Sequence, residues 1–270
     1  MKKSFFAALI LVLASLPAHA NTERKRNAEK PDYDTAARAL AFEMALIPES
    51  GVEIGQPVNV MLKMVDTKSG LAVPASFLRE TGDHIMHLTL TDGTLTDVQH
   101  LHPSPTETDG IYRFSFTPRM PGGYRGWAHV VSVEGKQQFV MGDIGTVRGG
   151  GLTKEVILQT QAGGYDFKLE FDDTPKLNNS RDAKLVIARN GAAVVPEQIY
   201  IIGIHEDLRT ILKTKFEEGS KLDFEIKPEE PGFVKLFIYA TIGNQPPVEV
   251  SLGFHVTGKK ESDFKFKSIF

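Results

Sequence analysis

Short runs of alternating apolar and polar residues, separated by turns rich in Gly, Pro and Asp, fill most of this 270-residue sequence. Alternation with a period of two places successive side chains on opposite faces of a β-strand. No stretch shows a convincing amphipathic helical pattern of useful length. The first seven predicted strands span residues 41–47, 58–65, 84–91, 94–102, 111–117, 123–133 and 137–144.

A glycine triplet, Gly149–Gly151, interrupts this pattern and indicates a linker. Seven further strands are predicted after it, at residues 165–171, 183–188, 199–204, 210–216, 221–226, 234–242 and 248–256. Many short strands with regular turns are typical of antiparallel sandwiches and not of βαβ folds. We therefore predict an all-β fold with two tandem immunoglobulin-like antiparallel β-sandwich domains, behind a signal peptide.

The predicted boundaries are placed at polar and Gly-rich segments of the chain. They are a signal peptide at 1–20, a flexible lead-in at 21–35, domain 1 at 36–147, a Gly-rich linker at 148–163, domain 2 at 164–257 and a tail at 258–270. A weak internal repeat supports two similar domains, because the segment from Pro121 to His129 matches the segment from Pro231 to Tyr239. In this alignment His129 corresponds to Tyr239.

The first twenty residues have the three parts of a secretory signal. Lys2 and Lys3 precede a short apolar run, and Ala18-His19-Ala20 forms a small-x-small cleavage site before Asn21. A soluble protein exported to the periplasm is the simplest interpretation, and secretion from the cell is the alternative. No later segment is long and apolar enough to predict a membrane span in the mature protein.

Composition narrows the class of partners. The sequence has no cysteine, which excludes disulfides and a lipid-modified cysteine. Loss of Lys2 and Lys3 with the signal leaves 29 basic residues against 34 acidic ones. Such an excess of acids does not favour nucleic acid. We expect either a metal ion or an envelope protein as the partner.

Four of the eight histidines lie between residues 84 and 102. Asp92-Gly93 predicts a two-residue type I′ hairpin turn, which pairs Thr89 with Thr96. One face of this hairpin then carries the apolar residues Met86, Leu88, Leu90, Leu95 and Leu101, and is expected to face the core. The opposite face carries His87, His100 and His102.

Imidazole is the commonest metal ligand in proteins, so this face is a candidate metal site. His129 and His84 are candidates to complete it, and the metal would be copper or zinc. Nearby methionines, among them Met86, favour copper, although Met86 is also a natural core residue. The structural alternative is that the histidines only satisfy backbone groups and end a strand before Pro103.

The histidines are followed by Gly110 and then by the run from Pro121 to Trp127, which contains Tyr124. This order of motifs resembles that of secreted bacterial Ig-like domains of the YtkA-like kind. The resemblance covers roughly residues 54–147, and more faintly the second domain. It implies a small β-sandwich on an exported protein, in a family sometimes linked to metal or copper handling. The matching residues are His87, His100, His102, Pro103, Gly110, Pro121, Gly122, Tyr124 and Trp127.

Tyr124, Arg125 and Trp127 are candidates for an interaction patch, because aromatic and Arg side chains anchor interfaces. The alternative is that the two aromatic rings pack inside a sandwich. Catalytic motifs are absent from the sequence: it contains no Gly-x-Ser-x-Gly elbow and no phosphate-binding loop. We therefore predict that the protein is not an enzyme.

Export gives the first testable prediction. Protein recovered from the periplasm should begin at Asn21, because the small residues Ala18 and Ala20 direct cleavage at that bond. N-terminal sequencing or intact-mass measurement checks this. A soluble form that retains Met1 would contradict it.

Overall fold

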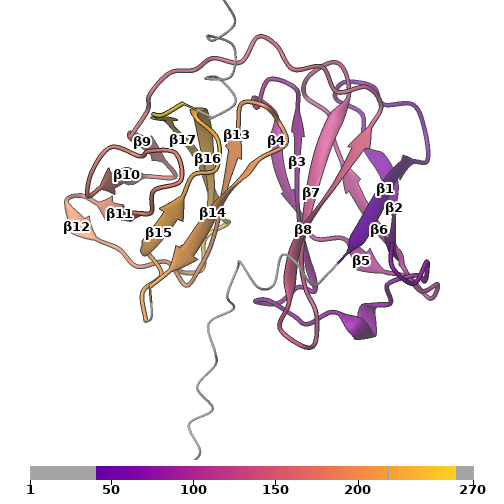
Figure 1. Cartoon of the computed structure of the whole chain (residues 1–270). Coiled ribbons are helices and arrows are strands. Elements are labelled where there is room, and N and C mark those ends of the chain that lie inside the picture. Colours follow the sequence, from indigo (N-terminus) through magenta and orange to yellow (C-terminus); the bar gives the residue numbers. More distant parts are fainter. Residues whose placement is uncertain (1–40, 218, 260–270) are drawn as a thin grey trace, which may run out of the picture. The chain divides into compact units, whose positions relative to one another are not determined.

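The computed structural model describes residues 41–217 and 219–259. The regular elements in this part of the chain are β-strands and one three-residue 3₁₀ helix, η1 (Ala75–Phe77) (Figure 1). The all-β prediction is confirmed. The predicted signal peptide, the lead-in and the tail from residue 260 onward lie outside the described residues. Within the described part of the chain, no helix has the length and apolar character needed to cross a membrane.

The first sandwich (residues 42–144) consists of two four-stranded antiparallel sheets. The strands of one sheet, in spatial order, are β1 (Phe42–Pro48), β2 (Val58–Asp66), β6 (Ile111–Phe116) and β5 (Ser104–Pro105). Those of the other sheet are β4 (Val98–Leu101), β3 (Met86–Asp92), β7 (Tyr124–Val131) and β8 (Gln137–Ile144). This strand order is A-B-E-D against C′-C-F-G, which is the immunoglobulin arrangement.

The second sandwich (residues 159–256) follows a similar plan, with two additional strands and one strand that changes sheets. Its strands are β9 (Gln159–Ala162), β10 (Tyr165–Phe171), β11 (Arg181–Arg189), β12 (Ala192–Ala193), β13 (Gln198–His205), β14 (Ile211–Phe216), β15 (Asp223–Lys227), β16 (Gly232–Thr241) and β17 (Val248–Val256). The additional strands are β9 and β12. The first two residues of β14 pair with β13 and the rest pair with β15, so this strand passes from one sheet to the other. The strand β9 lies within the stretch predicted as a linker.

Each sandwich has its own apolar core between its sheets. Alternate residues of β2, such as Val60 and Leu62, are fully buried in the first core. Phe167 and Leu185 are buried in the second core. The period-two pattern of the sequence therefore gives the inward faces correctly.

A third apolar cluster lies between the two sandwiches. It joins the outward faces of two sheets, the sheet β4-β3-β7-β8 and the sheet that contains β13 and β16. Its buried members are Leu95, Val98, Trp127, Ile202, Ile204, Leu208, Phe237 and Tyr239. The outward face of β3, β4 and β7 is consequently covered by protein, which the strand pattern alone does not predict.

The β3–β4 hairpin differs from the prediction. Thr89 pairs with His100 in place of Thr96, so the register is displaced by four residues and the predicted type I′ turn at Asp92–Gly93 is wrong. Because the displacement is an even number, the side chains of the paired strands β3 and β4 keep their predicted faces. His87 and His100 therefore still share the face opposite Leu88.

The Asp92 carboxylate explains the longer loop. Its oxygens accept hydrogen bonds from the backbone N–H groups of Thr94 and Asp97, both at 2.9 Å, and this fixes a wide loop ahead of β4. Gly93 is required here for close approach, because a Cβ atom at this position would collide with the backbone carbonyl of Arg148. Leu95, in the same loop, packs in the third cluster. The prediction that Leu95 faces the core of the first sandwich is therefore wrong.

Tyr124 anchors the turn that precedes β7. Its hydroxyl donates to the Asp97 carboxylate at 2.6 Å and accepts from the backbone N–H of Met120 at 3.0 Å. This is the tyrosine corner of immunoglobulin-like sandwiches. Burial, helped by the bond to Asp97, raises the pKa of this hydroxyl. Asp97 itself is buried and also pairs with Arg119 at 2.9 Å.

Substitution Tyr124→Phe tests the importance of this corner. We expect the free energy of unfolding to fall by about 1–3 kcal/mol, because the buried Asp97 carboxylate loses a hydrogen-bond donor. Urea unfolding measures the change. Tyr165→Phe is the matched control, since the Tyr165 hydroxyl makes no hydrogen bond within the described residues. Equal stability of the two variants would contradict the account.

Candidate metal centre

Three strands of one sheet present histidines on the outward face of the first sandwich. His87 on β3 lies opposite His129 on β7, and His100 on β4 lies opposite Thr89. His102 follows directly after β4, before Pro103. Since the intervening residues Met86 and Leu88 are buried in the core, the backbone holds these imidazoles on a rigid support.

Three ring nitrogens converge in this cluster. His100 Nε2 lies 3.2 Å from His87 Nδ1 and 3.1 Å from His102 Nε2. A ligand atom of each ring lies within 4.8 Å of the other two. This is the one group of metal-ligating side chains that meets this condition among the residues searched, which are those the structure describes.

The tautomer of His87 follows from its second nitrogen. His87 Nε2 lies 2.8 Å from the carbonyl oxygen of Thr81, which can only accept, so Nε2 carries the proton. Nδ1 of the neutral ring therefore presents its lone pair to the cluster. A ligating histidine whose other nitrogen donates to a backbone carbonyl is the usual arrangement around protein-bound metals.

Hydrogen bonds among the three rings cannot satisfy all of these contacts. His100 Nε2 has either one proton or one lone pair, yet it faces two nitrogens at hydrogen-bond distance. If it donates to His87 Nδ1, it has no lone pair for His102. Its other nitrogen, Nδ1, is buried and has no hydrogen-bond partner among the described residues. The polar atoms of His100 are thus left incompletely paired.

Two of the three nitrogen separations are close to those of a tetrahedral metal site, and the third is below 4.8 Å. Bonds of 2.0–2.1 Å to a tetrahedral ion place neighbouring ligand nitrogens about 3.3–3.4 Å apart. The two observed contacts, 3.1 and 3.2 Å, are close to this spacing. An ion at the centre would accept a lone pair from each ring, which the three rings cannot achieve among themselves.

His84 and His129 occupy different positions from these three. The His84 ring is exposed and stacks on His102 with centroids 3.6 Å apart, so it borders the open side of the cluster. His129 lies further away, with its ring centroid 6.5 Å from that of His87, and its Nε2 lies 3.0 Å from Gln137 Oε1. His84 is therefore the better placed of the two to complete the site.

Two tyrosines of the second sandwich cover the cluster. The ring of Tyr200, on β13, lies 4.3 Å from that of His100 and 5.2 Å from that of His87. Tyr239, on β16, stacks on His100 at 4.5 Å. A pocket of about 440 Å³ remains beside the histidines, bounded by these tyrosines and by the segment from Thr81 to His84.

The internal repeat explains where these tyrosines come from. Tyr200 pairs with Tyr239 across β13 and β16, just as His87 pairs with His129 across β3 and β7. The internal sequence alignment matches His129 with Tyr239, but it does not indicate that the two sandwiches pack against each other. Tyr200, Tyr239 and Thr81 are the site residues that sequence analysis missed.

Burial keeps the imidazoles neutral. It lowers the pKa of His100 to about 3, with repulsion from His102 as the next contribution, and lowers the pKa of His102 to about 4. The pKa of His129 falls to about 4 and that of His87 is also lowered, both mainly through burial. At neutral pH each ring therefore has a lone pair available for a metal.

The residues of the predicted interaction patch, Tyr124, Arg125 and Trp127, contact other residues of the same chain. Tyr124 lies in the first core and Trp127 in the third cluster, each with almost no exposed surface. Arg125 pairs with Asp143 at 2.6 Å and donates to the carbonyl oxygen of Leu208 at 2.8 Å. Trp127 and Arg125 thus contact the second sandwich.

Met86 is fully buried in the first core and contributes no ligand.

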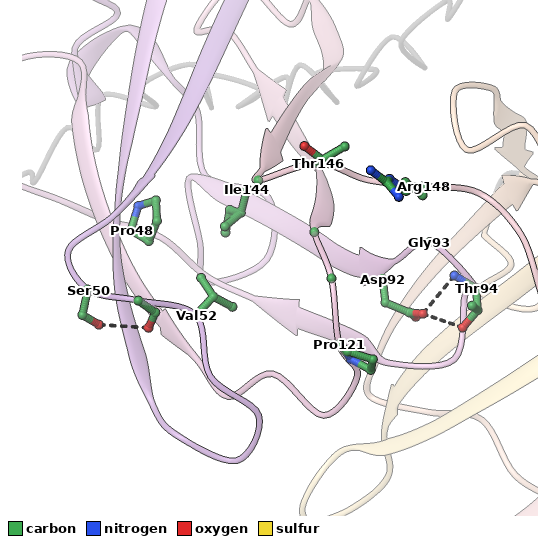
Figure 2. Close-up of a pocket in the computed structure, with 14 residues that line it drawn as sticks. Pro48, Ser50, Val52, Asp92, Gly93, Thr94, Pro121, Ile144, Thr146 and Arg148 are labelled. Atoms are coloured by element: carbon green, nitrogen blue, oxygen red, sulfur yellow. Dashed lines mark hydrogen bonds between the residues drawn. The ribbon is translucent and has the colours of Figure 1, made fainter.

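A separate hollow lies at the loop end of the first sandwich (Figure 2). Its volume is about 720 Å³, and it is lined by the segments near Pro48, Asp92, Pro121 and Ile144. Figure 2 shows the Asp92 side chain directed at Thr94, and the hydrogen bonds between them engage this carboxylate within its own loop.

Comparison with known proteins gives one family match. A model described as "Domain of unknown function (DUF8832)" matches residues 41–146, which contain the first sandwich. No curated protein matches the chain. The resemblance to YtkA-like domains stays a prediction.

Several solved structures are similar in fold. The Escherichia coli adhesin FdeC is 14% identical, with 81% of this chain and 65% of that chain covered and a TM-score of 0.25. A tetra-tandem repeat from the extending region of a large adhesion protein is 12% identical, with coverages of 81% and 50% and a TM-score of 0.27. The D00-D0 domain of intimin is 13% identical, with coverages of 78% and 98% and a TM-score of 0.21. The chain spans less than two thirds of the first two, and these similarities concern the fold alone.

The depressed histidine pKa values predict a pH dependence of stability. Above about pH 6.5 the rings are neutral in both states and stability is at its full value. Below that pH the unfolded chain binds protons that the folded chain does not, so stability should fall continuously between about pH 6.5 and about pH 4.

Denaturant unfolding with a chelator present measures this slope. Substitution His100→Gln should make the slope shallower, whereas His255→Gln, at an exposed position on β17, should leave it as in the wild type. Identical slopes in the wild type and in His100→Gln would show that burial does not depress the pKa of His100.

Proposed function

We propose that this is an exported β-sandwich protein that binds one Cu²⁺ or Zn²⁺ ion through His87, His100 and His102. The observation that carries the proposal is the convergence of three imidazole nitrogens, two of them 3.1 and 3.2 Å from the third. With neutral rings, no arrangement of protons makes two separate hydrogen bonds at His100 Nε2, whereas one metal ion would accept a lone pair from each of the three rings.

The chemistry of the ligands restricts the metal. Neutral imidazole is a borderline ligand that suits Zn²⁺ and Cu²⁺, while Mg²⁺ and Ca²⁺ prefer oxygen. Zn²⁺ accepts three imidazoles in a tetrahedral site with one further ligand, and Cu²⁺ binds nitrogen donors more tightly than the other divalent ions of its row. His84 or water would supply the remaining ligand.

Binding would demand little rearrangement. Because burial keeps the rings unprotonated at neutral pH, a metal ion displaces few protons. The carbonyl of Thr81 orients His87, and the tyrosine rings hold His100. The role we propose is binding and not catalysis, in keeping with the lack of nucleophile and phosphate-binding motifs in the sequence. The signal peptide predicted at residues 1–20 supports a periplasmic location.

The hollow at the loop end of the first sandwich supports a second candidate function. The loops of immunoglobulin-like domains cluster at the two ends of the sandwich, where they are free to bind partners. The hollow is formed by four chain segments at one such end and has the volume of a recognition pocket. The protein would then be a non-catalytic interaction module of the cell envelope that needs no metal.

Calorimetric titration of the mature protein with Cu²⁺ and with Zn²⁺ tests the metal proposal. We expect one ion per chain, bound less tightly as the pH falls toward the range where the histidines protonate. His102→Gln removes the most accessible of the three ligands at little cost to packing. It should weaken binding by more than the roughly 10–100-fold that loss of an outer-shell partner costs.

His255→Gln is the matched control, since it removes an exposed histidine that lies outside the cluster. Melting curves of both variants verify that they fold. If the wild-type protein takes up neither metal, the metal proposal fails and the interaction module remains. If both variants bind like the wild type, the site lies elsewhere.

A further inference from the structure

A second pocket lies beside the histidine cluster and separate from the three ligand nitrogens. It has a volume of about 400 Å³, within the range of small-molecule sites. Strand β8 of the first sandwich and strands β13 and β14 of the second sandwich form its walls, with His129 and Tyr200 at the side nearest the histidine cluster. Its apolar lining consists of Phe139, Ile199, Ile201, Ile211, Leu212 and Phe216.

One of the residues that line this pocket, Gln137, carries a buried and unpaired polar group. Gln137 is only 5% exposed, and its Oε1 is engaged by His129 Nε2 at 3.0 Å. Its Nε2 has no hydrogen-bond partner among the described residues. A buried amide N–H without a partner is destabilising, so such groups call for an explanation. The neighbouring Gln138 is different, because it bonds to both backbone groups of Phe42.

The lining also restricts the charge of a ligand. None of the described side chains that line the pocket is a Lys, Arg, Asp or Glu, and burial keeps His129 neutral. A charged ligand would lose its hydration without gaining an ionic partner. A neutral molecule with an apolar body would gain from the lining, and one hydrogen-bond acceptor would satisfy Gln137.

We propose that this pocket binds a small, neutral, mainly apolar molecule whose single oxygen acceptor receives a hydrogen bond from Gln137 Nε2. Aromatic ketones and similar carbonyl compounds have this chemistry. The proposal stands on the pocket and its unpaired amide, and does not require the metal function. Because His129 and Tyr200 border both pockets, such a ligand would lie next to the histidine cluster.

Fluorescence titration with prodan, a neutral naphthyl ketone whose emission shifts to the blue in apolar surroundings, tests the proposal. The mature protein is titrated in the presence of a chelator, so that the result is independent of metal binding. We expect saturable binding with blue-shifted emission. Gln137→Met should weaken prodan binding by roughly fivefold, the usual effect of one neutral hydrogen bond. Binding of naphthalene, which has no acceptor, should not change.

A second pair of variants locates the binding site. Thr214→Trp places a large ring in the pocket and should abolish prodan binding. Lys215→Trp adds the same ring at the next, exposed residue of β14 and should bind prodan like the wild type. Melting curves confirm folding. Absence of a blue shift in the wild type, or unchanged binding by Thr214→Trp, would overturn the site. Equal weakening of prodan and naphthalene by Gln137→Met would overturn the proposed role of the amide.

Discussion

The third apolar cluster, which joins the outward faces of two immunoglobulin-like sheets, is the interaction on which the rest of this structure depends. Trp127 and Leu95 from the first sandwich meet Ile202 and Phe237 from the second. Burying side chains of this size contributes roughly 1.5–3 kcal/mol each relative to exposure. The contact also covers the face that carries the histidines, so their burial, their low pKa values and both adjacent pockets are consequences of it.

The two sandwiches carry different side chains at corresponding positions where they meet. The cross-strand pair of His87 and His129 in the first corresponds to the pair of Tyr200 and Tyr239 in the second. The first sandwich carries the histidines that we propose as ligands, and the second carries the aromatic rings that cover them. Such a division leaves the ligands to one domain and shields them from bulk water with the other, which strengthens electrostatic interactions at the site.

Much of the fold follows from the sequence, because the alternating pattern assigns each strand residue to a face, and an error of register by an even number of residues leaves these faces unchanged. The hairpin loop is longer than predicted, since the Asp92 carboxylate organises it, but the even displacement keeps His87 and His100 on one face. The environment of that face could not be predicted. Nothing in the local pattern tells whether an outward Trp127 meets solvent, a partner or another domain, because this depends on tertiary packing. For the same reason Tyr200 and Tyr239 gave no signal as parts of the site.

The central claim is that His87, His100 and His102 bind one metal ion together. X-ray absorption spectroscopy of the mature protein after loading with Zn²⁺ or Cu²⁺ and removal of excess metal tests it most directly. The account predicts one ion per chain with three imidazole nitrogens at about 2.0–2.1 Å. A protein that retains no metal, or an ion surrounded only by oxygen ligands, would contradict it.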